Sequence, residues 1–269
     1  MNSRPDRACR TESLTRRQAE RGARITLILC VLSFSACHSG RSVNVYDGFE
    51  TASLGKLWET TKFVPGAVEI QAGTVRAGRS AARITLREGD RIEAGDEKSL
   101  PSERAELMEP ADLWALEDVS YAYSFSIFIP QDFPIVPTRL VIAQWKQRCP
   151  QARCDPDNPL IALRYIAGEL RITRQAGLQS SVLYRTRDEA RNRWLDFRFE
   201  IRFSRRESGH IKVWLNEIAI LDYTGVTAYP EAGGYPPQNR FYFKLGLYRD
   251  RMAEPMTIYV DEYRKEQLP

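Results

Sequence analysis

Apolar and polar residues alternate with a period of two along most of the chain, a pattern typical of β-strands with one face in a core. In residues 119–129 the odd positions are Val, Tyr, Tyr, Phe, Ile and Ile, and in residues 194–203 they are Leu, Phe, Phe, Ile and Phe. Small or charged residues fill most positions between them. We expect the odd positions of both segments to face the interior. Only 111–117 and 186–193 have the composition of short helices.

The same alternation predicts many more short strands, joined by turn pairs such as Ala167-Gly168 and Ser208-Gly209. These strands are expected at 43–49, 81–87, 103–109, 139–146, 160–166, 168–174, 180–185, 210–215, 217–223, 240–249 and 256–264. No linker or repeat divides them. The sequence therefore predicts an all-β fold over 43–269, a two-sheet antiparallel β-sandwich or jelly roll of the concanavalin A-like kind.

The first 37 residues differ from the rest in composition. Residues 25–34 form an apolar run of ten residues, preceded by several arginines and followed by Ser35-Ala36-Cys37. This run is too short to span a bilayer, which needs about 20 residues. A basic segment, a short apolar segment and a small-residue exit predict a signal peptide over 1–36. The cysteine at its end is similar to the bacterial lipoprotein signal, so Cys37 is the predicted lipidation site; a plain cleaved signal is the alternative.

Charge follows the same division. Residues 1–37 hold seven arginines and three acidic residues, whereas residues 38–269 hold 32 basic and 32 acidic residues. The basic pI thus belongs to the leader and gives no argument for nucleic-acid binding. We expect an exported monomer, in the periplasm, anchored to the outer membrane by a lipid on Cys37, or secreted. Apart from His38 the body has one histidine, His210, which excludes a multi-histidine metal site.

Two cysteines remain in the body. Cys149 and Cys154 are separated by four residues in a segment rich in proline and aspartate. Export permits disulfides, and zinc would need further ligands of the right kind nearby, so we predict a local disulfide. No cofactor or metal is expected. The run 155–158 carries oxygen ligands that suit a structural calcium ion, with a solvated turn as the other interpretation.

Two predicted strands carry charged or amide groups on one face. Side chains two apart on a strand point the same way, so Arg104 and Glu106 share a face. Gln144 and Lys146 share another face, which also includes Leu140 and Ile142. Taken alone, such a face is usually solvated, and an arginine beside a glutamate is commonly an ion pair.

The strand predicted at 240–249 has the sharpest division between its faces. Its even positions are Arg240, Tyr242, Lys244, Gly246 and Tyr248. Lys244 and Tyr248 lie about 13 Å apart along such a strand, the reach of two or three sugar units. Gly246 removes a side chain where a ligand can approach the backbone.

Together these segments resemble the heparin lyase I-like polysaccharide lyases and, more distantly, the jelly-roll alginate and glucuronan lyases. The RAEL of 104–107 is similar to that family's R-x-E-L strand, and the YFKLGLY of 242–248 is similar to its Y-x-K-x-G-x-Y strand. The QWK of 144–146 stands where the family usually has Gln-x-His. The resemblance covers most of 45–264.

The resemblance implies cleavage of an acidic, uronate-containing polysaccharide by β-elimination. Arg104 and Gln144 would hold and neutralise the uronate carboxylate, which suits the planar fork of arginine. Tyr248 would protonate the leaving oxygen and, where the proton and the leaving group are syn, also act as the base. The implied substrate-binding residues are Lys244, Tyr242, Glu106, Arg240 and Arg249.

Lys146 departs from the family pattern. Histidine suits a base near neutral pH, whereas lysine does so only with a depressed pKa. Lys146 is therefore either such a base or a neutraliser of the carboxylate, in which case Tyr248 makes both proton transfers. A carbohydrate-binding lipoprotein without activity is an alternative. A concanavalin-like glycoside hydrolase is another, but it needs two carboxylates on one strand face, and Asp261 and Glu262 point to opposite faces.

Overall fold

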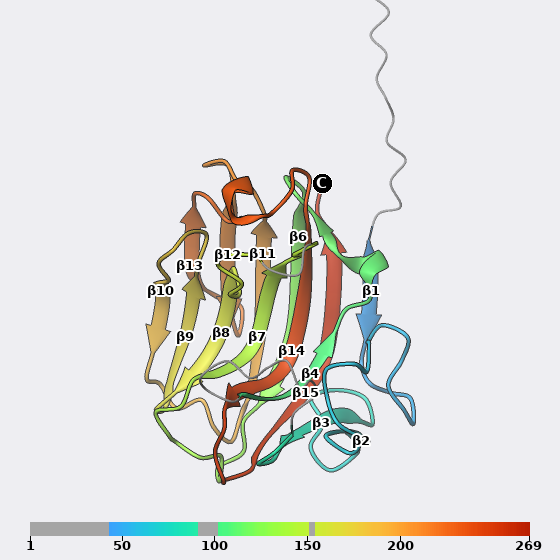
Figure 1. Ribbon diagram of the computed structural model, residues 1–269. Helices are drawn as coiled ribbons and strands as arrows, with labels where there is room; N and C mark the ends of the chain where they lie inside the picture. The colour runs from blue at the N-terminus through green and yellow to red at the C-terminus, as the bar shows by residue number, and fades with distance from the viewer. Residues whose placement is uncertain (1–42, 91–101, 151–153) are drawn as a thin grey trace, which may run out of the picture. The chain divides into compact units, whose positions relative to one another are not determined.

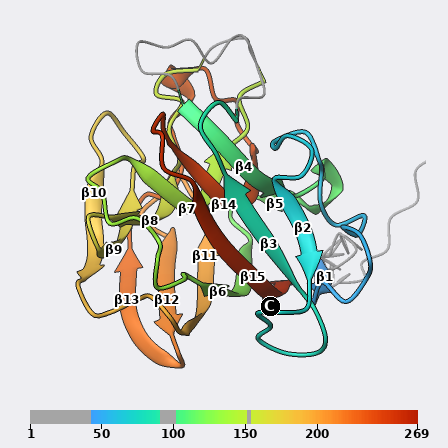
Figure 2. The ribbon, with the colours of Figure 1, turned by 90° about the horizontal axis from the view of Figure 1, so that it is seen from below.

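A computed structural model describes residues 43–90, 102–150 and 154–269. The predicted signal peptide and Cys37 lie outside the described residues. Almost all the regular secondary structure of the described part is β-strand, in two antiparallel sheets that lie one on the other as a sandwich (Figures 1 and 2). The prediction of an all-β sandwich is confirmed. No helix in these ranges is long and apolar enough to cross a membrane.

Sheet one has β6 and β15 at its centre. Its strands, in spatial order, are β13 (Ile218–Thr224), β12 (His210–Leu215), β11 (Trp194–Arg202), β6 (Ser120–Phe128), β15 (Met256–Gln267), β3 (Ala81–Leu86) and β2 (Val68–Gln71), with β1 (Asn44–Asp47) also paired to β15.

Sheet two lies in front of sheet one in Figure 1 and carries the three polar strand faces. Its strands, in spatial order, are β10 (Ser181–Thr186), β9 (Glu169–Arg174), β8 (Ile161–Ile166), β7 (Leu140–Gln147), β14 (Arg240–Asp250) and β4 (Ser102–Met108), with β5 (Ala115–Leu116) also paired to β14.

Aromatic side chains fill the space between the two sheets. On sheet one, the odd positions of β6 and β11 point inward and are buried, as the alternation predicts. Phe125 packs on Phe243 of sheet two with ring centroids 5.6 Å apart, and Phe199 packs on Trp145 at 4.6 Å. Such contacts add to the gain from burying large apolar area. The core therefore fixes the inner faces of β7 and β14, which leaves their polar residues on the outer face.

The two predicted helices are not formed as expected. Residues 111–117 give one short 3₁₀ turn, η1 (Ala111–Leu113), followed by β5. Residues 186–193 are irregular, because Glu189 captures the backbone N–H of Arg191 and Ala190 is buried in the core. Strand β2 was not predicted. A second 3₁₀ turn, η2 (Glu231–Gly233), lies in the loop before β14.

A bulge in β7 also changes one predicted strand face. The pairing of β7 with β8 and β14 shifts between Val141 and Ala143. As a result Leu140 belongs to the core, whereas Val141 lies opposite Tyr248 and outside the core cluster. Strict alternation had placed Leu140 and Ile142 with Gln144 and was wrong for both, which belong to the core, because a bulge reverses the parity of a strand.

Candidate active site

The register of sheet two brings the predicted catalytic residues onto one face. Arg104 of β4 lies directly opposite Tyr248 of β14, and Gln144 of β7 lies opposite Lys244 of β14. Lys146 of β7 lies opposite Tyr242. Residues directly opposite on neighbouring strands have side chains on the same face. The four groups expected to act together are thus on three adjacent strands of a single sheet face.

Glu106 is the centre of the ionic contacts on this face. Its carboxylate accepts a hydrogen bond from Gln144 Nε2 and another from Lys244 Nζ at 3.3 Å, and it pairs with Arg104 Nη1 at 3.6 Å. Only 2% of the Glu106 side chain is exposed. The buried carboxylate of Glu106 thus holds the side chains of Gln144, Lys244 and Arg104 together. A direct contact with an acidic sugar would be repulsive.

Burial also affects the titration of Lys244. Desolvation, reinforced by Arg104 and Lys146 and opposed by Glu106, lowers the pKa of Lys244 to about 8. Burial raises the pKa of the neighbouring Tyr242 phenol above its usual range. Tyr242 packs against Trp114 with ring centroids 5.2 Å apart. Tyr242 is therefore a neutral, fixed aromatic surface beside the ammonium of Lys244.

Tyr248 lies between two guanidinium groups. The Cζ atoms of Arg104 and Arg139 are 4.7 Å and 4.8 Å from the centre of its ring. Arg139 Nη1 also donates a hydrogen bond of 3.2 Å to the phenol oxygen, and Asp250 fixes Arg139 through an ion pair of 2.6 Å. Arg139 thus fixes the hydroxyl of Tyr248 on the same sheet face as Arg104.

Lys146 has a carboxylate partner. Its Nζ lies 2.7 Å from Oδ1 of Asp157, in the segment just after the disulfide. The predicted disulfide between Cys149 and Cys154 is confirmed. This ion pair holds the Lys146 side chain against the loop that follows the disulfide.

Two loops form a wall at the Lys146 end of this face. The N–H of Asp155 donates to the carbonyl of Gly233 at 3.0 Å, and the hydroxyl of Tyr235 donates to the carbonyl of Pro156 at 2.7 Å. Tyr229 stacks on Tyr235 with ring centroids 5.1 Å apart. The loop before β14 is thus hydrogen-bonded to the segment that contains Asp157.

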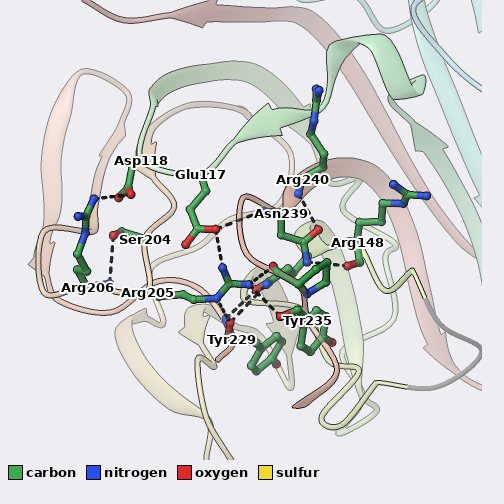
Figure 3. A network of polar contacts seen from close by, with 12 residues as sticks. Glu117, Asp118, Arg148, Ser204, Arg205, Arg206, Tyr229, Tyr235, Asn239 and Arg240 are labelled. Carbon is green, nitrogen blue, oxygen red and sulfur yellow. Dashed lines mark hydrogen bonds and ion pairs between the residues drawn. The ribbon is translucent and has the colours of Figure 1, made fainter. Parts of the chain in front are cut away.

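Arg205 holds this loop from the other side. Its guanidinium pairs with Glu117 at 2.7 Å and donates to the carbonyls of Tyr229 and Tyr235 at 2.8 Å and 3.3 Å. Figure 3 shows Arg205 between the acidic side chain and the loop, with Asn239 bonded to Glu117 through its N–H. The wall is therefore bonded to the sandwich through Arg205 and Glu117, in addition to the hydrogen bonds between its own two loops.

Some candidates lie elsewhere. Arg249 is fully buried, pairs with Glu103 at 2.9 Å and donates to two backbone carbonyls, which removes it from the set of groups that can meet a substrate. Arg240 lies exposed at the start of β14, about 26 Å along the strand from Tyr248. His210 begins β12, in the other sheet.

Gly246 serves the fold at this position. Its φ is 148°, and a Cβ atom there would lie 2.2 Å from the carbonyl oxygen of Ala105. The glycine thus lets β4 approach β14, where the sequence had indicated room for a ligand. In this way it keeps Arg104 and Glu106 beside Tyr248.

No site for a metal is formed in the described ranges by three or more His, Cys, Asp or Glu side chains. Asp157, one of the oxygen ligands considered for calcium, is used by Lys146. A surface cavity of about 630 Å³ next to the disulfide is lined by residues such as Leu178 and Gly233 and lies away from Tyr248.

Sequence reasoning missed Arg139 and Arg164, and it considered Asp157 only as an oxygen ligand for calcium. Alternation along the strand expected at 139–146 puts Arg139 on the face opposite to that of Gln144, and Asp157 lies in a loop. Arg164 comes to this face because β8 pairs with β7 with Arg164 opposite Val141. That pairing depends on the bulge in β7, which cannot be predicted from a single sequence.

Solved structures of known proteins resemble this fold. An endo-β-1,4-glucuronan lyase from the fungus Trichoderma reesei has a similar structure, with a TM-score of 0.61 and 16% identity over 78% of this chain and 90% of that chain. An alginate lyase from Corynebacterium sp. matches with a TM-score of 0.52 and 16% identity over 76% of this chain and 82% of that one. No curated protein matches in sequence.

These structural matches, at such low identity, show the fold alone. The family itself is shown by a sequence model described as "Polysaccharide lyase", which matches residues 46–264 and so spans nearly all of the described chain. It includes β4, β7 and β14, the three strands that carry Arg104, Gln144 and Tyr248. The chain belongs to the polysaccharide lyase family and is a polysaccharide lyase.

Proposed function

We propose that this lyase cleaves a polymer of 4-linked uronic acids by β-elimination, with Tyr248 as the group that transfers protons. The observation that carries the proposal is the placement of the Tyr248 phenol between Arg104 and Arg139, beside the cluster of Gln144, Lys244 and Glu106. Cationic and amide donors there suit a carboxylate, and a phenol near them suits proton transfer.

The reaction begins with neutralisation of the uronate carboxylate. Arg104, Gln144 and Lys146 offer guanidinium, amide and ammonium donors on neighbouring strands. Their charge lowers the energy of the enolate-like intermediate that forms when the proton on C5 leaves. The pair of electrons from the C5–H bond then forms the C4–C5 double bond, and the C4–O bond breaks with its electrons on the leaving oxygen.

Tyr248 makes both proton transfers in this proposal. Its phenolate, stabilised by Arg139 and Arg104, accepts the C5 proton, and the phenol then gives that proton to the leaving oxygen. One group serves both steps when the C5 proton and the leaving oxygen are on the same side of the ring. The ion pair with Asp157 supports Lys146 as a neutraliser, since the same side chain already binds one carboxylate. The anti route through Lys146 as base is thereby disfavoured.

The substrate class is proposed from charge and from the relatives. Glucuronan and alginate, named for the two similar enzymes, are both polymers of uronic acids. The motifs at 104–107 and 242–248 resemble those of heparin lyase I-like enzymes. The sulfated polymer heparin is therefore included in the test below, and its cleavage would support membership of that branch.

The test is incubation with glucuronan, alginate, heparin, hyaluronan and pectate at several pH values, with ultraviolet absorbance of the unsaturated uronate as the readout. Release of unsaturated product from at least one polymer is expected. New reducing ends without unsaturation would refute elimination and point to hydrolysis. Binding of a polymer without any cleavage would refute catalysis and support a binding protein of the same fold.

We also propose that the chain is exported through its leader, with a lipid on Cys37, and acts as a monomer. The disulfide between Cys149 and Cys154 supports an oxidising compartment. Mass spectrometry of the mature protein from the native host tests this proposal: a chain that begins at a diacylated Cys37 is expected, and a chain that retains residues 1–36 would contradict it.

A further inference from the structure

A row of arginines crosses the outer face of sheet two, beginning at Tyr248. Tyr248 lies opposite Val141, which in turn lies opposite Arg164 of β8. Arg164 lies opposite Arg171 of β9, and Arg171 lies opposite Arg185 of β10. Each pairing puts the next residue on the same face. The three guanidinium-bearing positions therefore form a line at right angles to the strands.

Within the described residues, Arg164 has no carboxylate partner of the kind that a partly buried arginine normally has. Its Nε donates to the hydroxyl of Thr173 at 3.1 Å, and in the described part of the chain no carboxylate forms an ion pair with it. Burial and the nearby charge of Arg139 lower the pKa of Arg164 from its usual value. A buried charge without a counterion is costly, so an anion from outside the protein would be bound favourably here.

The rest of the row is positive as well. Glu169 is the acid beside it, only 6% exposed, and it already serves both Arg171 and Arg187. Arg185 is exposed at the edge strand. Like charges directly opposite on adjacent strands destabilise a sheet. Three arginines in this arrangement are thus a cost to the fold that binding of an acidic polymer would offset.

The spacing fits a polymer chain. Neighbouring strands lie about 4.8 Å apart, so β8 is about 10 Å from β14 and β10 is about 19 Å from it. The first of these distances is the reach of about two sugar units from Tyr248. We propose that Arg164, Arg171 and Arg185 bind the carboxylates of uronate units on one side of the cleaved bond, as an extension of the substrate site across β8, β9 and β10.

This inference rests on the proposed function, and binding is therefore measured apart from cleavage. Isothermal titration calorimetry on Tyr248→Phe protein uses a disaccharide and a hexasaccharide of the polyuronate that the wild type cleaves, or of glucuronan and alginate if it cleaves none. Adding Arg164→Gln is expected to raise the Kd of the hexasaccharide about 10-fold to 100-fold, the loss of a charge-assisted contact. The disaccharide Kd is expected to change less than about twofold.

Two further variants make the result specific. Arg164→Lys retains the charge and is expected to retain most of the affinity. Arg198→Gln removes an arginine on the outer face of sheet one, where it pairs with Glu200 at 2.8 Å, and is expected to leave both Kd values unchanged. Circular dichroism verifies that each variant is folded.

The outcomes separate the two proposals. A wild type that releases unsaturated product while Arg164→Gln and Arg171→Gln bind the hexasaccharide normally overturns the row and leaves the lyase proposal standing. A wild type that cleaves nothing, while hexasaccharide binding still depends on Arg164, refutes the lyase proposal and supports the row as a binding site. The absence of any hexasaccharide binding by the Tyr248→Phe protein also overturns the assignment of the row to uronate carboxylates.

Discussion

Replacing Glu106 with glutamine tests whether this buried carboxylate holds the cationic side of the site together. The substitution keeps the shape but removes the charge that faces Lys244 at 3.3 Å and Arg104 at 3.6 Å. At an effective dielectric constant of about 20, the contact with Lys244 alone is worth about 5 kcal/mol before desolvation. Because Lys244 is 5% exposed, water cannot replace the lost anion. We expect a net loss of about 3–5 kcal/mol in the free energy of unfolding.

The loss depends on pH with a definite sign. The pKa of Lys244 in the folded protein, about 8, lies below its ordinary value, so the unfolded chain keeps this proton over an interval in which the folded chain does not. Stability from this group therefore rises with pH above about 8. Without Glu106, which raises that pKa, the rise begins at a lower pH. The difference between the two proteins is thus largest near pH 6.5 and smaller near pH 9.5.

Urea unfolding followed by tryptophan fluorescence at both pH values measures this difference. Titrating groups away from Glu106 are shared by the two proteins, and their contributions cancel. The control is Glu200→Gln, which breaks an ion pair on the outer face of sheet one and is expected to cost less than about 1 kcal/mol. A Glu106→Gln protein as stable as the wild type near pH 6.5, or a deficit equal at both pH values, would refute the reasoning.

Three further predictions concern activity and the loop. Arg139→Gln removes the hydrogen bond to the Tyr248 hydroxyl, so kcat for unsaturated product is expected to fall about 10-fold to 100-fold with little change in KM; an equal fall in affinity alone would contradict this. Lys146→Met is expected to lose most of kcat/KM and Lys146→Arg to keep most of it, because the proposal needs the positive charge of Lys146 and not a lone pair. An equal loss in both variants would indicate that Lys146 is the base. Cys149→Ser with Cys154→Ser is expected to lower stability by about 2 kcal/mol in a thermal melt, since the closed loop is short; failure to fold would contradict that estimate.

The core faces could be predicted because one rule determines them. Large apolar side chains at every second position of β6 and β11 have only the space between the sheets to fill, and Phe125 and Phe199 lie there. The same rule failed at Leu140, where a bulge shifts the register of β7. It also gave no information about 186–193, whose helix-like composition is overridden by the burial of Ala190.

The site could be predicted only in part, for a related reason. Arg104, Gln144 and Tyr248 were found from motifs within single strands. Arg164 and Arg139 were not, since their positions depend on how β7, β8 and β14 are paired. The use of Glu106 as an anchor, instead of a substrate contact, likewise follows from burial, which one strand cannot reveal.

The central claim is that Tyr248 transfers the protons of an elimination. The most direct measurement is the rate of formation of unsaturated product by Tyr248→Phe, on the polyuronate that the wild type cleaves, together with the Kd of that polymer. The account predicts a fall of at least about 100-fold in kcat with a Kd that changes little, because the ring and its contacts with Arg104 and Arg139 are kept. A variant that still produces unsaturated sugar at a rate near that of the wild type would contradict it.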